Sequence, residues 1–350
     1  MDHQNIRFHN VEELEPVEGG WLLRRVGAAA RARISPGVQE NCFATGIELR
    51  FTMPDGAVDL LLKTIPQAEA ATAHIFFGSF QGGWEYSSKN IGADVTRIHI
   101  EYPAKLATLR RITAEKQLAF APEVVRVVLP YVPVIFAGVE GRTALPAADQ
   151  LPQKTYLAYG SSITHGSLSL IQPDCYVFRN AQALGVDYLN LGFAGNALME
   201  EEMANYLVSR RDWDFASVEM GINTTERVKE FPLEVFEERI DRFTAVLARD
   251  PRPVFATSFF GYLDEDTDRT DKMRRIVRRY AAERLIFTDG LQLLDDETLI
   301  SADGTHPDAR GQEQIAARWS RIMAETLANR TARLVFCAFI ILYKTRRKNP

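Results

Sequence analysis

The sequence predicts an α/β fold in which a three-layer, doubly wound parallel sheet of five strands follows an all-β sandwich domain. Two observations carry this prediction: short apolar runs with turn signals fill the N-terminal part, and strand-like and helix-like segments alternate after Thr155. Short, regularly spaced strands are typical of a sandwich, and strands alternating with helices are typical of a parallel sheet. We therefore expect a jelly-roll-like domain at 1–145, an α/β domain at 154–330 and a tail at 331–350.

The expected strands of the first domain are rich in Val, Ile, Leu and Phe and are separated by Gly, Pro and Asp. They are predicted at 21–26, 47–53, 58–65, 74–80, 95–102 and 124–130. Residues 138–153 contain glycines and prolines but few large apolar side chains, which predicts a linker between two domains.

The second domain shows five short apolar runs separated by amphipathic stretches. The predicted strands are 156–159, 186–191, 215–220, 253–258 and 285–288. Apolar residues near a 3.6-residue period predict helices over 232–248, 272–284 and 311–327. In a doubly wound sheet, ligands bind at the carboxyl ends of the strands.

The composition excludes several classes of protein. The 350 residues are 46% hydrophobic and 25% charged, which is typical of a globular chain. The formal net charge of -5 argues against nucleic-acid binding, which needs a basic face. Three cysteines without a Cys-x-x-Cys pair support neither a zinc site nor a disulfide framework. The first residues lack the segments of a secretory signal, which favours a cytoplasmic location.

Polar residues and a glycine follow the carboxyl ends of the predicted parallel strands. Ser162 comes directly after the first strand, Gly195 after the second and Asn223 after the third, while Asp303 and His306 follow the fifth. Each has an ordinary structural alternative, because Ser and Asn cap helices, Gly forms turns and Asp caps loops. Their shared placement at one edge of the sheet favours a catalytic site.

His306 is the strongest candidate for a general base among the six histidines. It alone follows a late parallel strand and has a carboxylate, Asp303, three residues before it. Such an Asp can hold the imidazole in the tautomer that a base needs. His165 is the weaker alternative, because the helix after Ser162 is expected to carry it away from the nucleophile.

The order and placement of these segments resemble the four sequence blocks of the SGNH hydrolases, also called GDSL esterases. Segment 160–164, Gly-Ser-Ser-Ile-Thr, resembles the first block, with Ser161 in place of the usual Asp. Segments 190–195 and 221–224 resemble the Gly and Asn blocks, although the Asp that often follows the Asn is missing. Segment 303–307, Asp-Gly-Thr-His-Pro, resembles the last block closely.

The resemblance implies a serine esterase that needs no cofactor and no metal ion. It assigns Ser162 as the nucleophile, His306 as the base and Asp303 as the residue that orients the base. It also implies an oxyanion hole made of the Ser162 and Gly195 backbone N–H groups and the Asn223 side chain.

The resemblance covers about 155–327, and the upstream part resembles the N-terminal domain of one branch of these esterases. Segment 56–61 is a loose match to the Gly-x-Asp-Leu-Tyr-like motif of that branch. The branch implies a short acyl ester, with acetyl on a small or oligomeric carbohydrate as the first expectation. A lysophospholipase, a broad arylesterase and a catalytically silent carbohydrate-binding protein are the alternatives.

Trp84 and Ser161 are the candidate substrate contacts. Trp84 lies in the segment Gly-Gly-Trp-Glu-Tyr at 82–86, and aromatic faces stack on sugar rings. The alternative for this segment is an aromatic hairpin buried in the sandwich or its interface.

The tail contains a run of ten apolar residues, 334–343, followed by basic residues. A membrane-spanning helix needs about 20 apolar residues, so the run is too short to span. We expect an added strand or a segment packed on a partner, which makes the tail a candidate interface in a homo-oligomer. A basic-flanked anchor on a membrane surface is the alternative.

Overall fold

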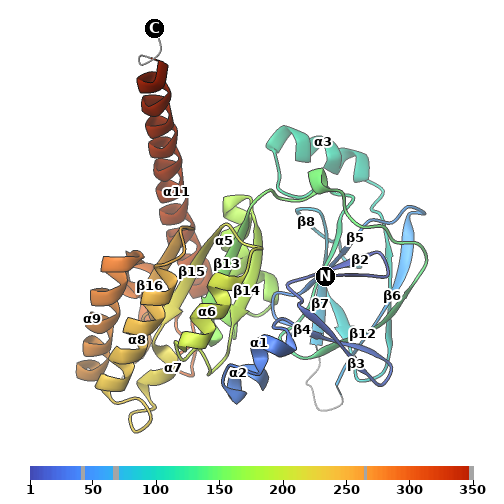
Figure 1. Cartoon of the computed structure of the whole chain (residues 1–350). Coiled ribbons are helices and arrows are strands. Elements are labelled where there is room, and N and C mark those ends of the chain that lie inside the picture. The colour runs from blue at the N-terminus through green and yellow to red at the C-terminus, as the bar shows by residue number, and fades with distance from the viewer. Residues whose placement is uncertain (41–43, 66–70, 264–265, 347–350) are drawn as a thin grey trace.

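The computed structural model describes residues 1–40, 44–65, 71–263 and 266–346, with the side chains of the long C-terminal helix described as far as Arg330. Antiparallel sheets lie on one side of the molecule and a helix-covered parallel sheet lies on the other (Figure 1).

The N-terminal part contains two antiparallel sheets. One has the strand order β1-β2-β5-β11-β7-β8, with β9 also paired to β7, and the other has the order β10-β6-β12-β4-β3. The strands are β1 (Asp2–His3), β2 (Ile6–His9), β3 (Glu13–Val17), β4 (Gly20–Arg24), β5 (Glu48–Phe51), β6 (Ala57–Thr64), β7 (Ala71–Phe77), β8 (Phe80–Gln81), β9 (Lys89–Ile91), β10 (Thr96–Glu101), β11 (Val125–Val128) and β12 (Val134–Glu140).

Side-chain alternation explains how these two sheets pack. In β6 every second residue is buried, and Val58, Leu60 and Leu62 therefore point to one face. They pack in the same core cluster as Leu49 and Phe51 of β5, which belongs to the other sheet. The two sheets thus enclose one hydrophobic core.

The prediction that this region is all-β is wrong in its details. It also contains helices α1 (Ala28–Arg31), α2 (Pro36–Glu40) and α3 (Leu106–Lys116). Helix α3 is rich in good helix formers but buries none of its residues. Its sequence therefore lacks the apolar stripe by which a core-facing helix can be predicted. Strand β12 also extends to Glu140, into the start of the predicted linker.

The C-terminal part contains the predicted parallel sheet of five strands, with the order β14-β13-β15-β16-β17. The chain places β14 on one side of β13 and every later strand on the other. The loops that follow β13 and β15 therefore meet at the point where the strand order reverses, which is where doubly wound sheets bind ligands. The strands are β13 (Thr155–Gly160), β14 (Asp187–Gly192), β15 (Phe215–Met220), β16 (Val254–Ser258) and β17 (Ile286–Thr288).

Helices cover both faces of this sheet, as a doubly wound fold requires. Apolar residues of α6, α8 and α9 share one core cluster with the sheet, and those of α5 and α11 share a second. The helices are α4 (Ser162–His165), α5 (Tyr176–Leu184), α6 (Glu201–Ser209), α7 (Ile222–Thr225), α8 (Leu233–Leu247), α9 (Thr267–Arg284), α10 (Gly290–Leu293) and α11 (Ala309–Arg346).

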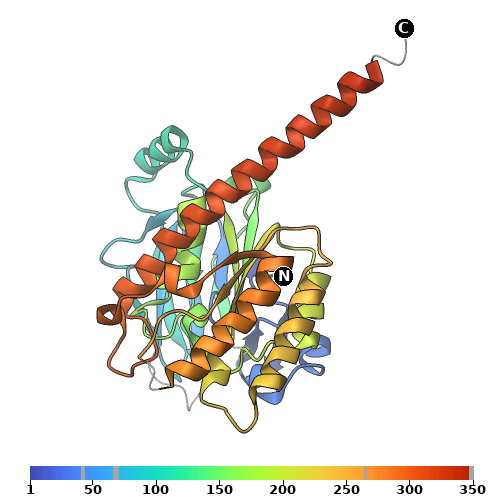
Figure 2. The same cartoon turned by 90° about the vertical axis from the view of Figure 1, so that its left-hand side faces the viewer.

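The predicted strand in the tail is wrong, because α11 continues through the apolar run to Arg346. Its first part packs on the sheet through Ile315, Trp319 and Met323, and its last part extends away from the body of the molecule (Figure 2). Once a helix is formed, each added residue gains a hydrogen bond, whereas a strand would need an edge to pair with. In the part of the chain that the structure describes, no helix is long and apolar enough to cross a membrane.

Residues of the N-terminal part also enter the cores around the parallel sheet. Val26, Ile34 and Val38 belong to the cluster that contains α6, α8 and α9. Phe76 and Val128 belong to the cluster that contains α5 and α11. The antiparallel sheets and the parallel sheet are therefore joined by shared apolar packing.

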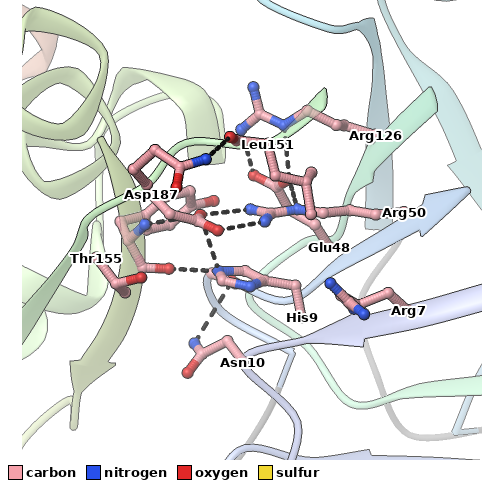
Figure 3. A network of polar contacts seen from close by, with 12 residues as sticks. Arg7, His9, Asn10, Glu48, Arg50, Arg126, Leu151, Thr155 and Asp187 are labelled. Atoms are coloured by element: carbon pink, nitrogen blue, oxygen red, sulfur yellow. Dashed lines mark hydrogen bonds and ion pairs between the residues drawn. The ribbon is translucent and has the colours of Figure 1, made fainter. Parts of the chain in front are cut away.

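A buried ionic network adds a second connection, at the amino end of β14 (Figure 3). Arg50 of β5 donates two hydrogen bonds, of 2.6 and 2.7 Å, to the carboxylate of Asp187, the first residue of β14. The same guanidinium donates to Glu48, which also accepts from Arg126 at 2.6 and 2.8 Å. His9 lies 3.3 Å from Asp187.

Candidate active site

Ser162 stands at the N-terminus of a short helix, immediately after the carboxyl end of β13. Ser161 is the N-cap of this helix, and its hydroxyl accepts a hydrogen bond from the Ile163 N–H at 3.1 Å. The cap turns the chain sharply, so that Ser162 lines a cavity at the carboxyl edge of the sheet.

Three predicted residues form a continuous hydrogen-bonded chain at this edge. His306 Nε2 lies 2.7 Å from the Ser162 hydroxyl oxygen, across 144 residues of sequence. His306 Nδ1 lies 2.6 Å from Asp303 Oδ2. When Nδ1 donates its proton to the carboxylate, Nε2 is left as an acceptor for the serine hydroxyl, which is the arrangement a general base needs.

The loop that carries Asp303 keeps its carboxylate ionised. Asp303 Oδ1 accepts hydrogen bonds from the backbone N–H groups of Thr305 and His306, both at 3.0 Å, and from the Ser301 hydroxyl at 2.7 Å. Burial alone would raise the pKa of Asp303, but these hydrogen bonds outweigh it and hold the pKa well below its usual range. The acceptor that faces His306 is therefore negatively charged at neutral pH.

Asn223 and Gly195 line the same cavity from the loops after β15 and β14. Asn223 Oδ1 accepts a hydrogen bond from the Ala197 N–H at 3.0 Å, which fixes the side-chain amide and leaves its NH₂ group as the donor for a ligand. Gly195 has φ +70°, a conformation that favours glycine, and a Cβ there would meet open space. The structure thus brings both predicted oxyanion donors to the cavity that holds Ser162.

The cavity has a volume of about 490 Å³ and is open to solvent on one side. Its polar groups come from Ser162, His306 and Asp303 and from the loops after β14 and β15. Its apolar wall comes mainly from Leu168, Ile222 and Tyr262. This size is within the range of small-molecule sites. The lining residues are Ser162, Ser167, Leu168, Ala194, Gly195, Ile222, Asn223, Thr225, Glu226, Arg227, Tyr262, Asp303, Thr305 and His306.

Neither predicted substrate contact lies in this cavity. Trp84 is fully exposed in a loop of the N-terminal part and is not among the lining residues, while Tyr86 beside it is buried. Ser161 is fully buried, because its hydroxyl caps the helix and its N–H donates to Glu219 at 2.7 Å. Ser161 therefore faces the protein interior in this structure, and the role of both residues as substrate contacts stays a prediction.

His165, the weaker candidate for the base, points away from the nucleophile. Its Nε2 lies 2.5 Å from the Thr45 hydroxyl of the N-terminal part, and its ring is buried beside Tyr131. Burial, followed by the charge of Arg25, lowers the pKa of His165 to about 3, so the ring is neutral at physiological pH.

Sequence reasoning missed three charged residues at the site, one of which is Glu226, a lining residue of the cavity. Arg227 lines the cavity and donates a 2.7 Å hydrogen bond to the Gly195 carbonyl. Glu219 lies buried beneath the nucleophile turn, where burial raises the pKa of its carboxyl group. An acidic residue within the apolar strand 215–220 was a usable signal for Glu219, whereas nothing local marks Arg227. No group of three or more His, Cys, Asp or Glu within the described ranges is placed to hold a metal ion.

Comparisons with known proteins add to this geometry at the level of the fold. A scan against family models and a search of curated proteins find no match. Solved structures do match along almost the whole chain. A salicylyl-acyltransferase, SsfX3, from a tetracycline biosynthetic pathway has a TM-score of 0.69 at 16% identity, covering 92% of this chain and 95% of that one.

Two esterases give similar results. A family two carbohydrate esterase from Cellvibrio japonicus has a TM-score of 0.61 at 10% identity and covers 92% of this chain and 95% of that chain. An acetyl xylan esterase, Est2A, from the rumen bacterium Butyrivibrio proteoclasticus has a TM-score of 0.55 at 12% identity, with 94% and 96% covered. The chain therefore has the fold of these structures, and the predicted doubly wound parallel sheet of five strands is confirmed.

Proposed function

We propose that the protein is a serine esterase that hydrolyses short acyl esters through an acyl-enzyme. The observation that carries the proposal is the chain of hydrogen bonds from Ser162 through His306 to Asp303, at 2.7 and 2.6 Å, opening on a cavity of about 490 Å³. A nucleophile, a base and an orienting carboxylate within hydrogen-bond reach are the parts that acyl transfer needs.

In the first half-reaction, the Ser162 oxygen attacks the ester carbonyl while its proton moves to His306 Nε2. Asp303, ionised at neutral pH, stabilises the imidazolium that forms. The tetrahedral intermediate collapses when the bond to the alcohol breaks, and the alcohol leaves with the proton held on Nε2. The acyl group remains bonded to Ser162.

The negative charge that develops on the carbonyl oxygen needs donors that are already in place. We assign this role to the backbone N–H groups of Ser162 and Gly195 and to the NH₂ group of Asn223, which the Ala197 N–H orients through Oδ1. In the second half-reaction, water gives a proton to His306, attacks the acyl carbon and releases the acid, and the proton returns to Ser162.

We propose acetyl on a carbohydrate as the substrate, and the cavity has room for both the acyl group and part of a sugar. Two of the similar structures are named as a carbohydrate esterase and an acetyl xylan esterase, which supports this choice. The apolar wall of Leu168, Ile222 and Tyr262 is suited to a methyl group or a short chain. A lysophospholipase or a broad arylesterase is the alternative, and a longer preferred acyl chain would favour it.

Transfer of the acyl group to an alcohol instead of water is a second candidate, because another similar structure is named as an acyltransferase. The two reactions share the acyl-enzyme and differ in the acceptor that attacks it. The product mixture formed with an added polyol separates them, since a transferase yields a new ester and a hydrolase yields the free acid.

A panel of acetylated sugars and aryl esters of increasing acyl length tests the proposal. We expect hydrolysis that is fastest for acetyl, absent in Ser162→Ala and insensitive to EDTA. A parent protein that hydrolyses none of these esters contradicts the esterase and favours a catalytically silent carbohydrate-binding protein. A rate that survives Ser162→Ala contradicts the assignment of Ser162 as the nucleophile.

Several expectations about organisation stay predictions. They are the domain limits at 1–145 and 154–330, the cytoplasmic location and the homo-oligomer formed through the tail at 331–350. Truncation of the chain after Asn329, followed by sedimentation, tests the last of these, and an unchanged oligomeric state contradicts it.

A further inference from the structure

We propose that Arg25, in the N-terminal part, is a positioning residue for the oxyanion loop, defined here as residues 193–197. This inference rests on the function proposed above, because the loop carries Gly195. It assigns the antiparallel part a role in catalysis that needs no contact with substrate.

Arg25 follows β4 directly and reaches the carboxyl end of β14, 165 positions away in sequence. Its guanidinium donates to the Asn190 carbonyl at 2.8 Å and to the Gly192 carbonyl at 2.9 Å. It also lies 5.0 Å from the centre of the Phe193 ring, the first side chain of the oxyanion loop. The side chain is fully buried, so these contacts are shielded from water.

The strand end that Arg25 holds is also connected to the nucleophile helix. The Asn190 amide donates to the Thr164 carbonyl at 2.8 Å, and its oxygen accepts from the Gly192 N–H at 2.8 Å. A Cβ on Gly192 would lie 2.1 Å from the His165 backbone nitrogen, which shows how closely the strand and the helix approach. A shift of the strand end would therefore displace the nucleophile and the oxyanion loop relative to each other.

Two more residues of the N-terminal part hold the same elements. Asn10 donates to the Asn190 carbonyl at 3.0 Å, beside the Arg25 contact. The Thr45 hydroxyl lies 2.5 Å from His165 Nε2 on the nucleophile helix. The antiparallel part thus contacts both sides of the junction between the nucleophile and the oxyanion donors.

Lysine cannot replace arginine in this arrangement. The planar guanidinium presents several donors in a fixed fork and stacks on an aromatic face, whereas an ammonium is a single charged point. Arg25→Lys keeps the positive charge but cannot donate hydrogen bonds to the Asn190 and Gly192 carbonyls at the same time. A displacement of about 1 Å at a reacting centre costs roughly a hundredfold in rate.

Arg50→Lys provides a matched control. Arg50 is also a buried arginine of the N-terminal part that bonds β14, but it binds Asp187 at the amino end of the strand, away from the cavity (Figure 3). Both variants lose one bidentate contact between the same two parts of the molecule. Only Arg25→Lys loses it beside the oxyanion loop.

The experiment measures kcat and KM for an aryl acetate, with kcat expressed per active site titrated by a fluorophosphonate. This correction removes any loss that comes only from unfolded protein. We expect Arg25→Lys to lower kcat per site by roughly 10- to 100-fold with KM little changed, as for an interaction that acts in the transition state. Arg50→Lys should keep the parent kcat per site. Equal kcat values in the two variants overturn the proposal.

Amide hydrogen exchange provides a readout that is independent of activity. We expect Arg25→Lys to speed exchange in peptides that cover 190–197, and Arg50→Lys to leave those peptides unchanged. Unchanged exchange in Arg25→Lys overturns the proposal even if kcat falls. If the parent shows no Ser162-dependent hydrolysis, the proposed function fails, and this exchange comparison alone decides whether Arg25 holds the loop.

Discussion

Two polar networks lie at opposite edges of the same parallel sheet, and they differ in what their protons can do. At the carboxyl edge, Ser162 and His306 line a cavity and share a hydrogen bond through which a proton can pass. At the amino edge, Glu48 and Arg50 are buried ions whose charges are fixed by each other and by Asp187 (Figure 3).

The environment of each network explains the difference. Burial alone would raise the pKa of Glu48, but the charges of Arg126 and Arg50 hold it far below its usual range. The Glu48 carboxylate therefore stays ionised at neutral pH, and its side chain is fully buried. A polar network can take part in catalysis when a ligand can reach it and one of its protons can be transferred. A buried network whose charges are fixed can instead contribute to the specificity of the fold.

The largest effect should follow from removing Ser162, the proposed nucleophile. We expect Ser162→Ala to lower kcat for an aryl acetate by roughly a millionfold, because the remaining groups cannot form the acyl-enzyme. The variant should unfold at the parent temperature. Ser209→Ala, which removes an exposed hydroxyl on α6, is the control and should keep the parent rate. Residual burst kinetics in Ser162→Ala would show that another residue is acylated.

Breaking the buried network should cost stability and leave the chemistry alone. Glu48→Gln removes the carboxylate that Arg50 and Arg126 share, and we expect the free energy of unfolding to fall by about 3–5 kcal/mol. Urea denaturation measures the loss. Glu140→Gln, which breaks an exposed pair with Arg97, is the control and should change stability little. A large drop in kcat per titrated site in Glu48→Gln would contradict the separation of the two networks.

Removing one oxyanion donor should reduce activity less than removing the nucleophile. We expect Asn223→Ala to raise the activation free energy by roughly 2.7–4 kcal/mol, which is a hundredfold or more in kcat. Steady-state kinetics with an aryl acetate provide the measurement. Asn205→Ala, on the exposed face of α6, removes a similar amide outside the cavity and should have no effect. A parent-like rate in Asn223→Ala would remove this residue from the oxyanion hole.

The smallest effect concerns the dependence of stability on pH. The pKa of His165 falls from 6.5 to about 3 on folding. Below pH 6.5, His165 is therefore protonated in the unfolded chain but stays neutral in the folded protein. Stability is therefore lost as the pH falls. Between pH 7 and 5 we expect the parent to lose about 2 kcal/mol more than His165→Gln.

Denaturant unfolding at the two pH values measures this difference, and His99→Gln is the control, since its ring is exposed. The His165→Gln variant also tests whether His306 or His165 is the general base. Loss of activity in His165→Gln, with His306→Gln still active, would reverse the assignment.

Much of the catalytic half could be predicted because its signals are local. The predicted strand 215–220 coincides with β15, and the other four parallel strands agree within a residue or two, since buried parallel strands are short apolar runs. Ser162 and Asn223 follow such runs closely, whereas α10 and a loop separate His306 from the last one. Parallel strands end at one edge of the sheet, so placement in sequence predicted proximity in space.

Features that depend on partners distant in sequence were missed or misjudged. Helix α3 buries no residue and so leaves no pattern, and the apolar tail was expected to be a strand although α11 carries it on as a helix. Trp84 has the residue type of a sugar contact, yet its loop lies outside the cavity. Residue type suggests what a side chain can do, whereas only the fold decides what it meets.

By itself, the sequence determined the alternation of strands and helices in the second half, and it predicted Ser162, His306 and Asp303 as a nucleophile, its base and the carboxylate that orients the base. Apolar periodicity and turn residues act over a few positions, and each strand could be recognised in isolation. Only the tertiary structure decided that Arg25 bonds the carboxyl end of β14 and that Arg50 bonds its amino end. Those contacts join residues more than a hundred positions apart, and their energy exists only once both sheets have formed and excluded water.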